Sequence, residues 1–339
     1  KIKPDFAEAY SNMGAALTDK GDLEAAVDSC KQALKIKPDY AEAFNNMGNS
    51  LMNKGDFKTA IGSYDRALKI KPDYAECFVN RGSLQLQISE SNYVERKLES
   101  HVNQNLKKIL IDNPKHQIHV AIKQFINGDY VSSVKCLQRY RTLVEVEKNN
   151  KLNKKDQFFC DGYYTFISSL IEKRPTCLSI SKNKIYHVGE SHCLSYARHK
   201  VTVQQQTFSV SPMITFGAKA YHFTKLQENS FKSITRHNLD NIPNSSVVLI
   251  SFGEIDCRAN EGLIRTAQKT KSSLEEIVQK TVNGYINWFL AANEDNKHSY
   301  NFLNVPAPVY KREYTLSVNK KVANVIRLFN DALRRNLLD

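Results

Sequence analysis

The sequence predicts two architectures in one chain: an all-α superhelix of helical repeats, followed by an α/β unit with a parallel sheet. A near-identical ten-residue phrase recurs every 34 residues from the start of the chain, and a period of that length is typical of helix–turn–helix repeats. Beyond Pro175, short β-rich runs alternate with longer helical ones, as they do in βαβ units. The length of 339 residues also favours two domains.

The repeated phrase reads KIKPDFAEAY, KIKPDYAEAF and KIKPDYAECF, and it defines the first region, residues 1–88. Small and aromatic residues recur at matching places in each repeat, namely Gly14, Gly48 and Gly82, Tyr10, Phe44 and Phe78, and Ala26, Ala33, Ala60 and Ala67. This pattern resembles the tetratricopeptide repeat, in which glycine and alanine lie where paired helices approach closely. The resemblance implies a superhelix whose concave groove holds a protein or peptide partner.

The repeat pattern decays after Gly82, and we interpret residues 89–174 as degenerate repeat-like and capping helices with a basic linker. The stretch AIKQFINGDYVSSVKCLQRY keeps a Gly-Asp-aromatic turn and predicts a degenerate repeat at about 116–141. The stretch DQFFCDGYYTFISSLIEK predicts a last helix that caps the array and ends before Pro175.

Composition limits the classes of function. The first 100 residues carry 14 basic and 15 acidic side chains, while the remainder carries 34 against 20, so the net charge of +13 lies in the second part. The lysines are dispersed except in EKNNKLNKKD at 147–156, which we interpret as a solvated linker and not as a nucleic-acid site. No apolar run approaches the ~18–20 residues of a membrane span. The seven cysteines form no CxxC pair, which favours a reducing, cytoplasmic setting.

The region 175–339 is predicted to be an α/β domain. Strands are expected at 184–189, 207–217, 245–253 and 300–308, with amphipathic helices at 274–290 and 318–333. Open parallel sheets place their sites at the carboxyl ends of the strands. Three of the expected strands carry polar residues at their carboxyl ends, in the segments HVGESH, ITFGAKAYHF and LISFGEIDCR.

Taken together, these three strand ends resemble the SGNH (GDSL-type) hydrolase superfamily over about 185–310. The resemblance implies a three-layer, flavodoxin-like fold and a serine esterase or acyl-modifying enzyme that acts on acyl esters, acylated saccharides among them. It makes Ser191 the nucleophile and Gly217 a backbone donor to the oxyanion. The other expected pocket residues are Gly189, Glu190, His192, Gly253, Glu254, Asp256 and Arg258.

Local chemistry agrees with this assignment. Gly189 permits a sharp exit from the strand, and Ser191 then starts the next helix, where free N–H groups and the helix dipole favour an oxyanion. The alternative for Ser191 is a helix N-cap without catalytic role, because serine is common at that position.

Two departures from the family pattern bear on activity. Ile255 stands where the family has an asparagine that donates to the oxyanion, and Asp256 is expected to pair with Arg258. The string DNKH at 295–298 satisfies Asp-x-x-His, but it precedes its strand and is rejected as the catalytic block. Because the sequence stops after a helix, we expect the family's Asp-x-x-His block beyond Asp339 and no activity without it.

The remaining histidines and cysteines receive structural assignments. His192 points about 100° away from Ser191 on a helix and is therefore not its base; it lines the pocket or lies on the helix surface. His187 and His222 are expected to be half-buried, and Cys193 to be a small buried hydrophobe. Glu254 and Asp256 lack further ligands in the sequence, so neither a metal ion nor another cofactor is predicted.

Three functions remain in competition. The first is a repeat array that docks a partner, fused to an SGNH-like hydrolase. The second is a non-catalytic interaction scaffold with a degenerate α/β domain. Similar repeats also accompany protein glycosyltransferases, but the chain shows no sugar-nucleotide-binding pattern, and that alternative is set aside.

Overall fold

The computed structural model of the chain describes residues 5–88, 111–146, 152–173, 183–203, 205–259, 262–306 and 314–338. The chain divides into two compact units, residues 1–176 and 177–339, which are described separately. The decayed repeat after residue 88, the basic run at 147–151 and the boundary at Pro175 lie outside the described residues.

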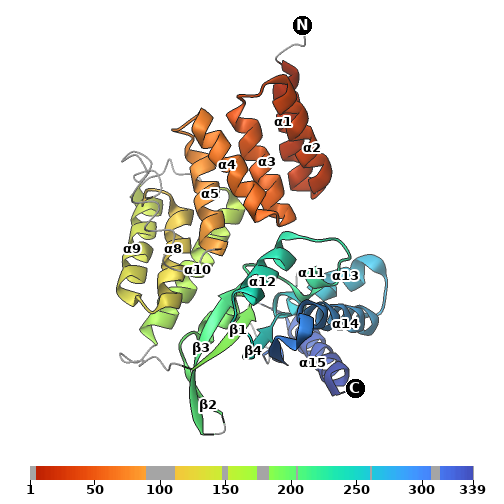
Figure 1. Cartoon of the computed structure of the whole chain (residues 1–339). Helices are drawn as coiled ribbons and strands as arrows, with labels where there is room; N and C mark the ends of the chain where they lie inside the picture. Colours follow the sequence, from red (N-terminus) through yellow and green to blue (C-terminus); the bar gives the residue numbers. More distant parts are fainter. Residues whose placement is uncertain are drawn as a thin grey trace. The chain divides into compact units, whose positions relative to one another are not determined.

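The first unit is helical, as the repeats predict (Figure 1). Its helices are α1 (Asp5–Lys20), α2 (Leu23–Ile36), α3 (Ala41–Lys54), α4 (Phe57–Ile70), α5 (Ala75–Ile88), α8 (Pro114–Asn127), α9 (Tyr130–Val146) and α10 (Lys154–Glu172). Consecutive helices pack in pairs, α1 on α2, α3 on α4 and α8 on α9, and α2 also packs on α3. The pair α8–α9 and the helix α10 occupy the segments for which a degenerate repeat and a capping helix are predicted.

Local sequence explains where these helices begin and end. Gly55 ends α3 with a left-handed φ of 93°, a conformation that glycine adopts without steric cost. Asp56 then caps α4, and its side chain accepts a hydrogen bond from the Thr59 N–H. The four alanines predicted at small positions, Ala26, Ala33, Ala60 and Ala67, are all fully buried.

Gly48 lies at a close approach between α3 and α4. A Cβ atom at this position would lie 2.5 Å from the Tyr64 ring, and Tyr64 is fully buried. The Tyr64 hydroxyl also donates a 2.7 Å hydrogen bond to Asn49, which holds the ring in place. The ring therefore has no easy way to move aside.

We expect Gly48→Ala to lower the free energy of unfolding of the helical unit by about 1–3 kcal/mol, the usual cost of overpacking. The matched control is Gly62→Ala on α4, where a Cβ would meet nothing within 4 Å and where alanine should stabilise the helix by about 0.5–1 kcal/mol. Urea unfolding followed by far-UV circular dichroism measures both variants. Equal stability of the two would contradict the close approach.

The second unit alternates strands with helices (Figure 1). Its strands are β1 (Lys184–Gly189), β2 (Lys200–Val203), β3 (Gln206–Ile214), β4 (Ser246–Ser251) and β5 (His298–Phe302). Its α-helices are α11 (Ala220–Phe223), α12 (Ser230–Asp240), α13 (Gly262–Thr270), α14 (Leu274–Ala292) and α15 (Leu316–Leu338). Short 3-10 helices occur at η1 (Ser191–Tyr196), η2 (Ile255–Cys257) and η3 (Glu294–Asn296).

The five strands form one mixed sheet in the order β2-β3-β1-β4-β5. β3, β1, β4 and β5 run parallel to one another, whereas β2 pairs antiparallel with β3 at the edge. The prediction of an α/β domain after the repeats is confirmed. The prediction of an all-parallel sheet was wrong at β2, a four-residue strand whose short stretch gives too little periodicity to be recognised.

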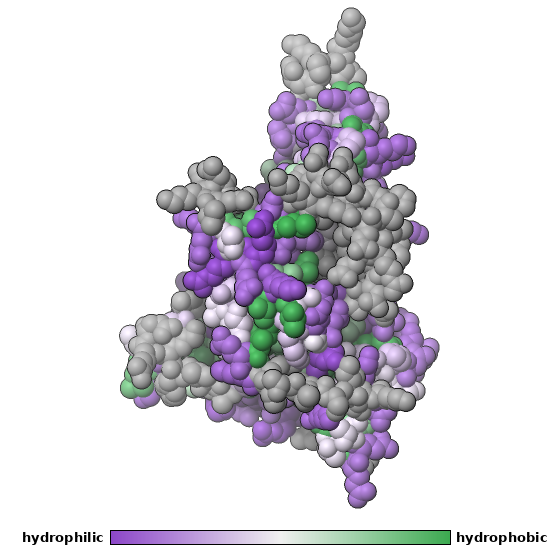
Figure 2. Space-filling model, turned by 90° about the vertical axis from the view of Figure 1, so that its left-hand side faces the viewer, coloured by the Kyte–Doolittle hydropathy of each residue, from purple (hydrophilic) through white to green (hydrophobic). Residues whose placement is uncertain are grey.

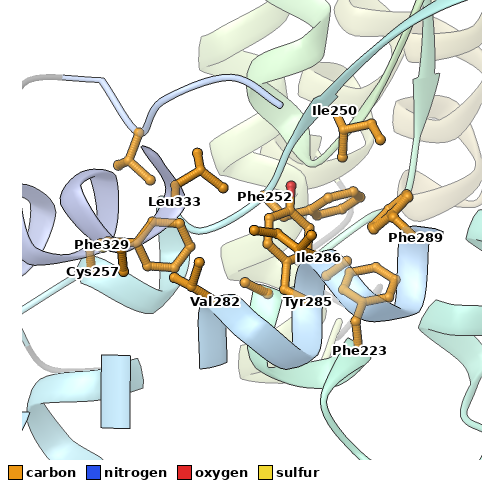
Figure 3. Close-up of a cluster of buried hydrophobic side chains, with 14 of the residues drawn as sticks. Phe223, Ile250, Phe252, Cys257, Val282, Tyr285, Ile286, Phe289, Phe329 and Leu333 are labelled. Carbon is orange, nitrogen blue, oxygen red and sulfur yellow. The ribbon is translucent and has the colours of Figure 1, made fainter. Parts of the chain in front are cut away.

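The core of this unit lies between the sheet and its helices. Figure 3 shows Phe223, Phe252, Tyr285 and Phe289 gathered beside Ile250 of β4, and residues from α11 to α15 join the same buried cluster. The opposite face of β1 carries His187, whose ring packs against Tyr196 of η1 at 5.4 Å between centroids. Within the described part of this unit, η1 covers that face near the carboxyl end of β1, and a second layer of α-helices is not seen there.

Figure 2 shows one face on which hydrophilic residues predominate and hydrophobic ones form small separate groups. Phe158 of α10 is the most exposed aromatic residue among the described positions, at 81% of its maximal exposure. No described helix combines the length and the apolar character required to cross a membrane.

Candidate functional site

Three loops meet at the carboxyl edge of the sheet. Gly189 ends β1 and pairs with Ile214 of β3 on one side and Ser251 of β4 on the other. The loops that follow these strands therefore leave the sheet side by side. The Thr215 N–H donates to the Gly189 carbonyl at 2.8 Å and ties the second loop to the first. Gly189, Ser191, Gly217 and Gly253 thus lie at the same edge of the sheet, on or after three adjacent strands.

Gly189 is required by the packing at this edge. A Cβ atom on it would lie 2.5 Å from the Ser251 hydroxyl and 2.8 Å from the Ser251 carbonyl oxygen. The Ser251 hydroxyl in turn shares a 2.7 Å hydrogen bond with His187 Nε2. A larger residue at position 189 would push β1 away from β4 two residues before Ser191.

Ser191 begins η1, a 3-10 helix of only six residues. Ser191 does start the next helix, as the sequence analysis expects, but a 3-10 helix of this length has little dipole of its own. The chain turns back into β2 by Lys200, and the short turn leaves only a few aligned N–H groups to favour an oxyanion. Ser191 is half-buried, whereas Cys193 and Leu194 of the same helix are fully buried and anchor it.

Glu190 points inward beneath these loops and is 1% exposed. Its Oε1 accepts a 3.1 Å hydrogen bond from the Glu254 N–H, which joins the loop after β1 to the loop after β4. Its Oε2 is buried without a hydrogen-bond partner among the described residues. Burial raises the pKa of the Glu190 carboxyl well above its usual range, and the charges of Glu254 and Asp256 add to the rise.

The Glu254 carboxylate lies near both Arg258 and His192. Arg258 Nη2 donates to Glu254 Oε2 at 2.9 Å, and Arg258 Nε contacts the same carboxylate. His192 Nδ1 lies 4.0 Å from Glu254 Oε2 and has no hydrogen-bond partner within the described chain. That nitrogen therefore does not take the Ser191 proton in this structure, although Glu190, His192 and Glu254 do come together as the sequence analysis expects of pocket residues.

Asp256 does not pair with Arg258, which corrects the sequence-based expectation. Glu254 lies four residues before Arg258, so one helical turn brings that pair together. Asp256 is instead fully buried, and its carboxylate accepts hydrogen bonds from the N–H groups of Ala220 and Tyr221 at 2.7 and 3.2 Å. Burial raises the pKa of Asp256 to about 6 in spite of these bonds. Its role is to fix the loop after β3 against the loop after β4.

The other histidines and the cysteine considered in the sequence analysis lie in structural positions. His187 is fully buried, and burial lowers its pKa to about 4. His222 Nδ1 accepts from the Lys219 N–H, and its ring stacks on Phe231 at 3.9 Å. Burial raises the pKa of the Cys193 thiol, which keeps it protonated. His298 pairs with Ser246 at the amino end of β4, at the opposite end of the sheet from Ser191.

A cavity of about 690 Å³ opens beside the loops that Asp256 joins. Ligand pockets usually have about 300–1,000 Å³. Most of its lining surface is apolar, and basic and hydroxyl side chains stand around it, among them Lys219, Arg265, Lys269, Lys280, Thr224, Thr266, Thr270 and Ser272. Glu276 and Asp256 are the acidic residues of its described wall. Such a lining suits an oxygen-rich ligand with negative charge.

Comparison with known families identifies the repeats in part of the first unit. A family described as TPR repeat matches residues 14–55, and one described as tetratricopeptide repeat matches residues 41–74. Residues 14–74 are tetratricopeptide repeats. Such repeats imply protein partners. A search of curated proteins found no match for the chain.

Sequence reasoning placed Glu190, His192 and Glu254 in one pocket, but it did not predict that these three side chains form a cluster of possible metal ligands. Glu190 and Glu254 are 64 positions apart, and nothing in the local pattern relates them. The available signal was that both residues directly follow the last glycine of a predicted strand, in HVGE and SFGE. Adjacent parallel strands would place these two equivalent positions together.

Proposed function

We propose that the α/β unit is an SGNH-type serine hydrolase or acyltransferase domain that acts on acyl esters, with the tetratricopeptide repeats docking a protein partner. Ser191 is the nucleophile in this proposal. Gly217 and Ser191 supply backbone N–H donors for the tetrahedral intermediate. The observation that carries the proposal is the meeting of the 189–191, 215–217 and 253–258 loops at the carboxyl edge of three adjacent parallel strands.

The contacts among these loops support the proposal. The Glu190 and Asp256 carboxylates each join two of the loops by accepting hydrogen bonds from backbone N–H groups. Such bonds hold a nucleophile and its donors rigidly, as an oxyanion site requires. The cavity beside the loops that Asp256 joins offers basic and hydroxyl side chains to an acylated saccharide, although neither Ser191 nor Gly217 lines it.

The general base belongs to an Asp-x-x-His block in the resembled family. His192 Nδ1 and His298 are not placed to serve Ser191, the first because it has no hydrogen-bond partner and the second because it begins β5 at the other end of the sheet. The activity assay uses the natural full-length protein.

The decisive experiment is hydrolysis of 4-nitrophenyl acetate by that protein. Ser191→Ala should lower kcat/KM by at least about 10³-fold, because removal of a nucleophile disables the whole catalytic unit. The matched control is Ser195→Ala, a half-buried serine on the same 3-10 helix, which should keep wild-type rates. Equal rates for Ser191→Ala and wild type would favour the alternative, a non-catalytic scaffold with a degenerate α/β domain.

The docking role of the repeats is tested separately. Protein lacking residues 1–88 should keep its hydrolysis of the small ester and should lose its partner in a pull-down from cell extract. Retention of the same partner without the repeats would contradict docking by the concave groove.

A further inference from the structure

We propose that Glu190, His192 and Glu254 form a binding site for a divalent transition-metal ion, with zinc as the best-matched ion. This inference concerns side chains other than the Ser191 hydroxyl and does not rest on the proposed hydrolase activity. His192 Nδ1 or Nε2 and one carboxylate oxygen from each glutamate all lie within 4.8 Å of one another.

The geometry needs only a small closure to hold an ion. Zinc bonds to histidine nitrogen and carboxylate oxygen are about 2.0–2.2 Å long, which places neighbouring ligand atoms roughly 3–4 Å apart. His192 and Glu254 are half-buried, so their side chains can rotate inward by the remaining distance. The Glu190 side chain is held in place by the hydrogen bond that its Oε1 accepts from the Glu254 N–H.

Two unpartnered atoms point independently to a missing ligand. Glu190 is 1% exposed, and its Oε2 is buried without a hydrogen-bond partner in the described chain. His192 Nδ1 is likewise buried and unpartnered there. Buried polar atoms in folded proteins are nearly always satisfied by protein, water or ion. A cation between these side chains would satisfy a carboxylate oxygen and an imidazole nitrogen at once.

The neighbouring charges act on a bound ion in two ways: the carboxyl groups attract it, and Arg258 competes with it for Glu254. Glu190, Glu254 and the buried Asp256 bring three carboxyl groups close together, and Arg258 is the cation that contacts Glu254. Arg258 contacts both oxygens of Glu254, and Oε2, the oxygen nearest His192, also accepts from Arg258 Nη2, so a bound ion must displace part of this ion pair. The guanidinium still repels a bound cation, and Arg258 therefore weakens binding.

Donor chemistry selects the class of ion. One imidazole nitrogen and two carboxylate oxygens suit zinc better than magnesium or calcium, which prefer oxygen ligands alone. Three protein ligands leave a fourth position open, as in catalytic zinc sites. Water or an anionic group of a ligand would complete the coordination.

The test is calorimetric titration of untagged, chelator-treated full chain with zinc sulfate, and cobalt(II) absorption reports the coordination directly. Wild type should bind one equivalent, and a tetrahedral cobalt spectrum should appear. Glu190→Gln keeps the size of the side chain and the acceptor for the Glu254 N–H. It should weaken zinc binding at least tenfold, as should His192→Gln. The control Glu228→Gln, on an exposed carboxylate paired with Arg236, should bind as wild type does.

The Arg258→Met variant distinguishes a metal site from a network of ion pairs that binds no metal. Loss of the competing guanidinium should tighten zinc binding severalfold, whereas loss of an ion pair alone would leave zinc affinity unchanged. Absence of stoichiometric zinc binding in wild type, or equal affinity in Glu190→Gln and Glu228→Gln, would overturn the proposal. If Glu190→Gln fails to fold, His192→Gln decides the question, since that side chain is half-buried. The outcome is independent of ester hydrolysis, which Ser191→Ala tests by itself.

Discussion

Phe289→Ala should lower the free energy of unfolding of the α/β unit by about 3–5 kcal/mol, the usual cost of removing a buried phenylalanine ring. Phe289 is fully buried on α14 and contacts the rings of Phe223, Tyr285 and Phe302 at centroid distances of 5.2, 5.5 and 6.0 Å. Phe223 lies on α11, Phe302 on β5 and Tyr285 one turn earlier on α14 itself, so the rings are held by three separate elements and cannot collapse together into the space that alanine leaves; Figure 3 shows Phe223 and Tyr285 beside Phe289.

The chain offers a selective probe for this measurement. Trp288, the sole tryptophan, packs against the same cluster, so its fluorescence during urea unfolding reports the α/β unit. The matched control is Leu290→Ala on the same helix, where the side chain is 54% exposed and the change should stay within about 0.5 kcal/mol. Similar losses in the two variants would contradict the assignment of the core face of α14.

Acidification should destabilise the helical unit by several kcal/mol between about pH 6.5 and pH 3. Burial lowers the pKa of His116 to about 4 and that of His119 to about 3, from an ordinary value of about 6.5. Both rings are thus neutral in the folded state and gain protons first in the unfolded state. Their contribution is complete above pH 6.5 and is lost as the pH falls toward the folded pKa values.

The pH effect is assigned by substitution at His119. This ring packs against Phe159 at 5.4 Å between centroids, so His119→Phe keeps an aromatic ring there without a titrating group. Urea unfolding followed by circular dichroism from pH 7 to pH 4 should show a shallower loss of stability in the variant. An unchanged slope would mean that the pH dependence comes from other groups.

Much of the fold was predictable because its signals are local. The 34-residue period predicted the repeats, and Gly48 was correctly placed at a close approach of helices, where Tyr64 meets it. The strand at 184–189 was predicted with the bounds that the structure shows. By contrast, β2 was missed because four residues carry no distinct pattern, and its antiparallel pairing depends on β3.

The candidate site was less predictable because its contacts join distant segments. The sequence suggested an Asp256–Arg258 pair, since the two residues are near neighbours. The fold instead turned Asp256 toward the Ala220 and Tyr221 N–H groups and left Arg258 to Glu254. Burial of a carboxylate depends on which loop lies over it, and a local pattern carries no information about that.

The sequence by itself determined the helical repeats, the order of the two units and the polar residues at the ends of the strands. These features depend on helical period, strand alternation and turn residues, and each of those acts over only a few positions. Only the tertiary structure decided that Glu190, His192 and Glu254 share one cluster and that Asp256 is buried. The physical reason is strand pairing. The register of β1 against β4 brings together side chains that are 64 positions apart, and that register is set by packing across the whole sheet.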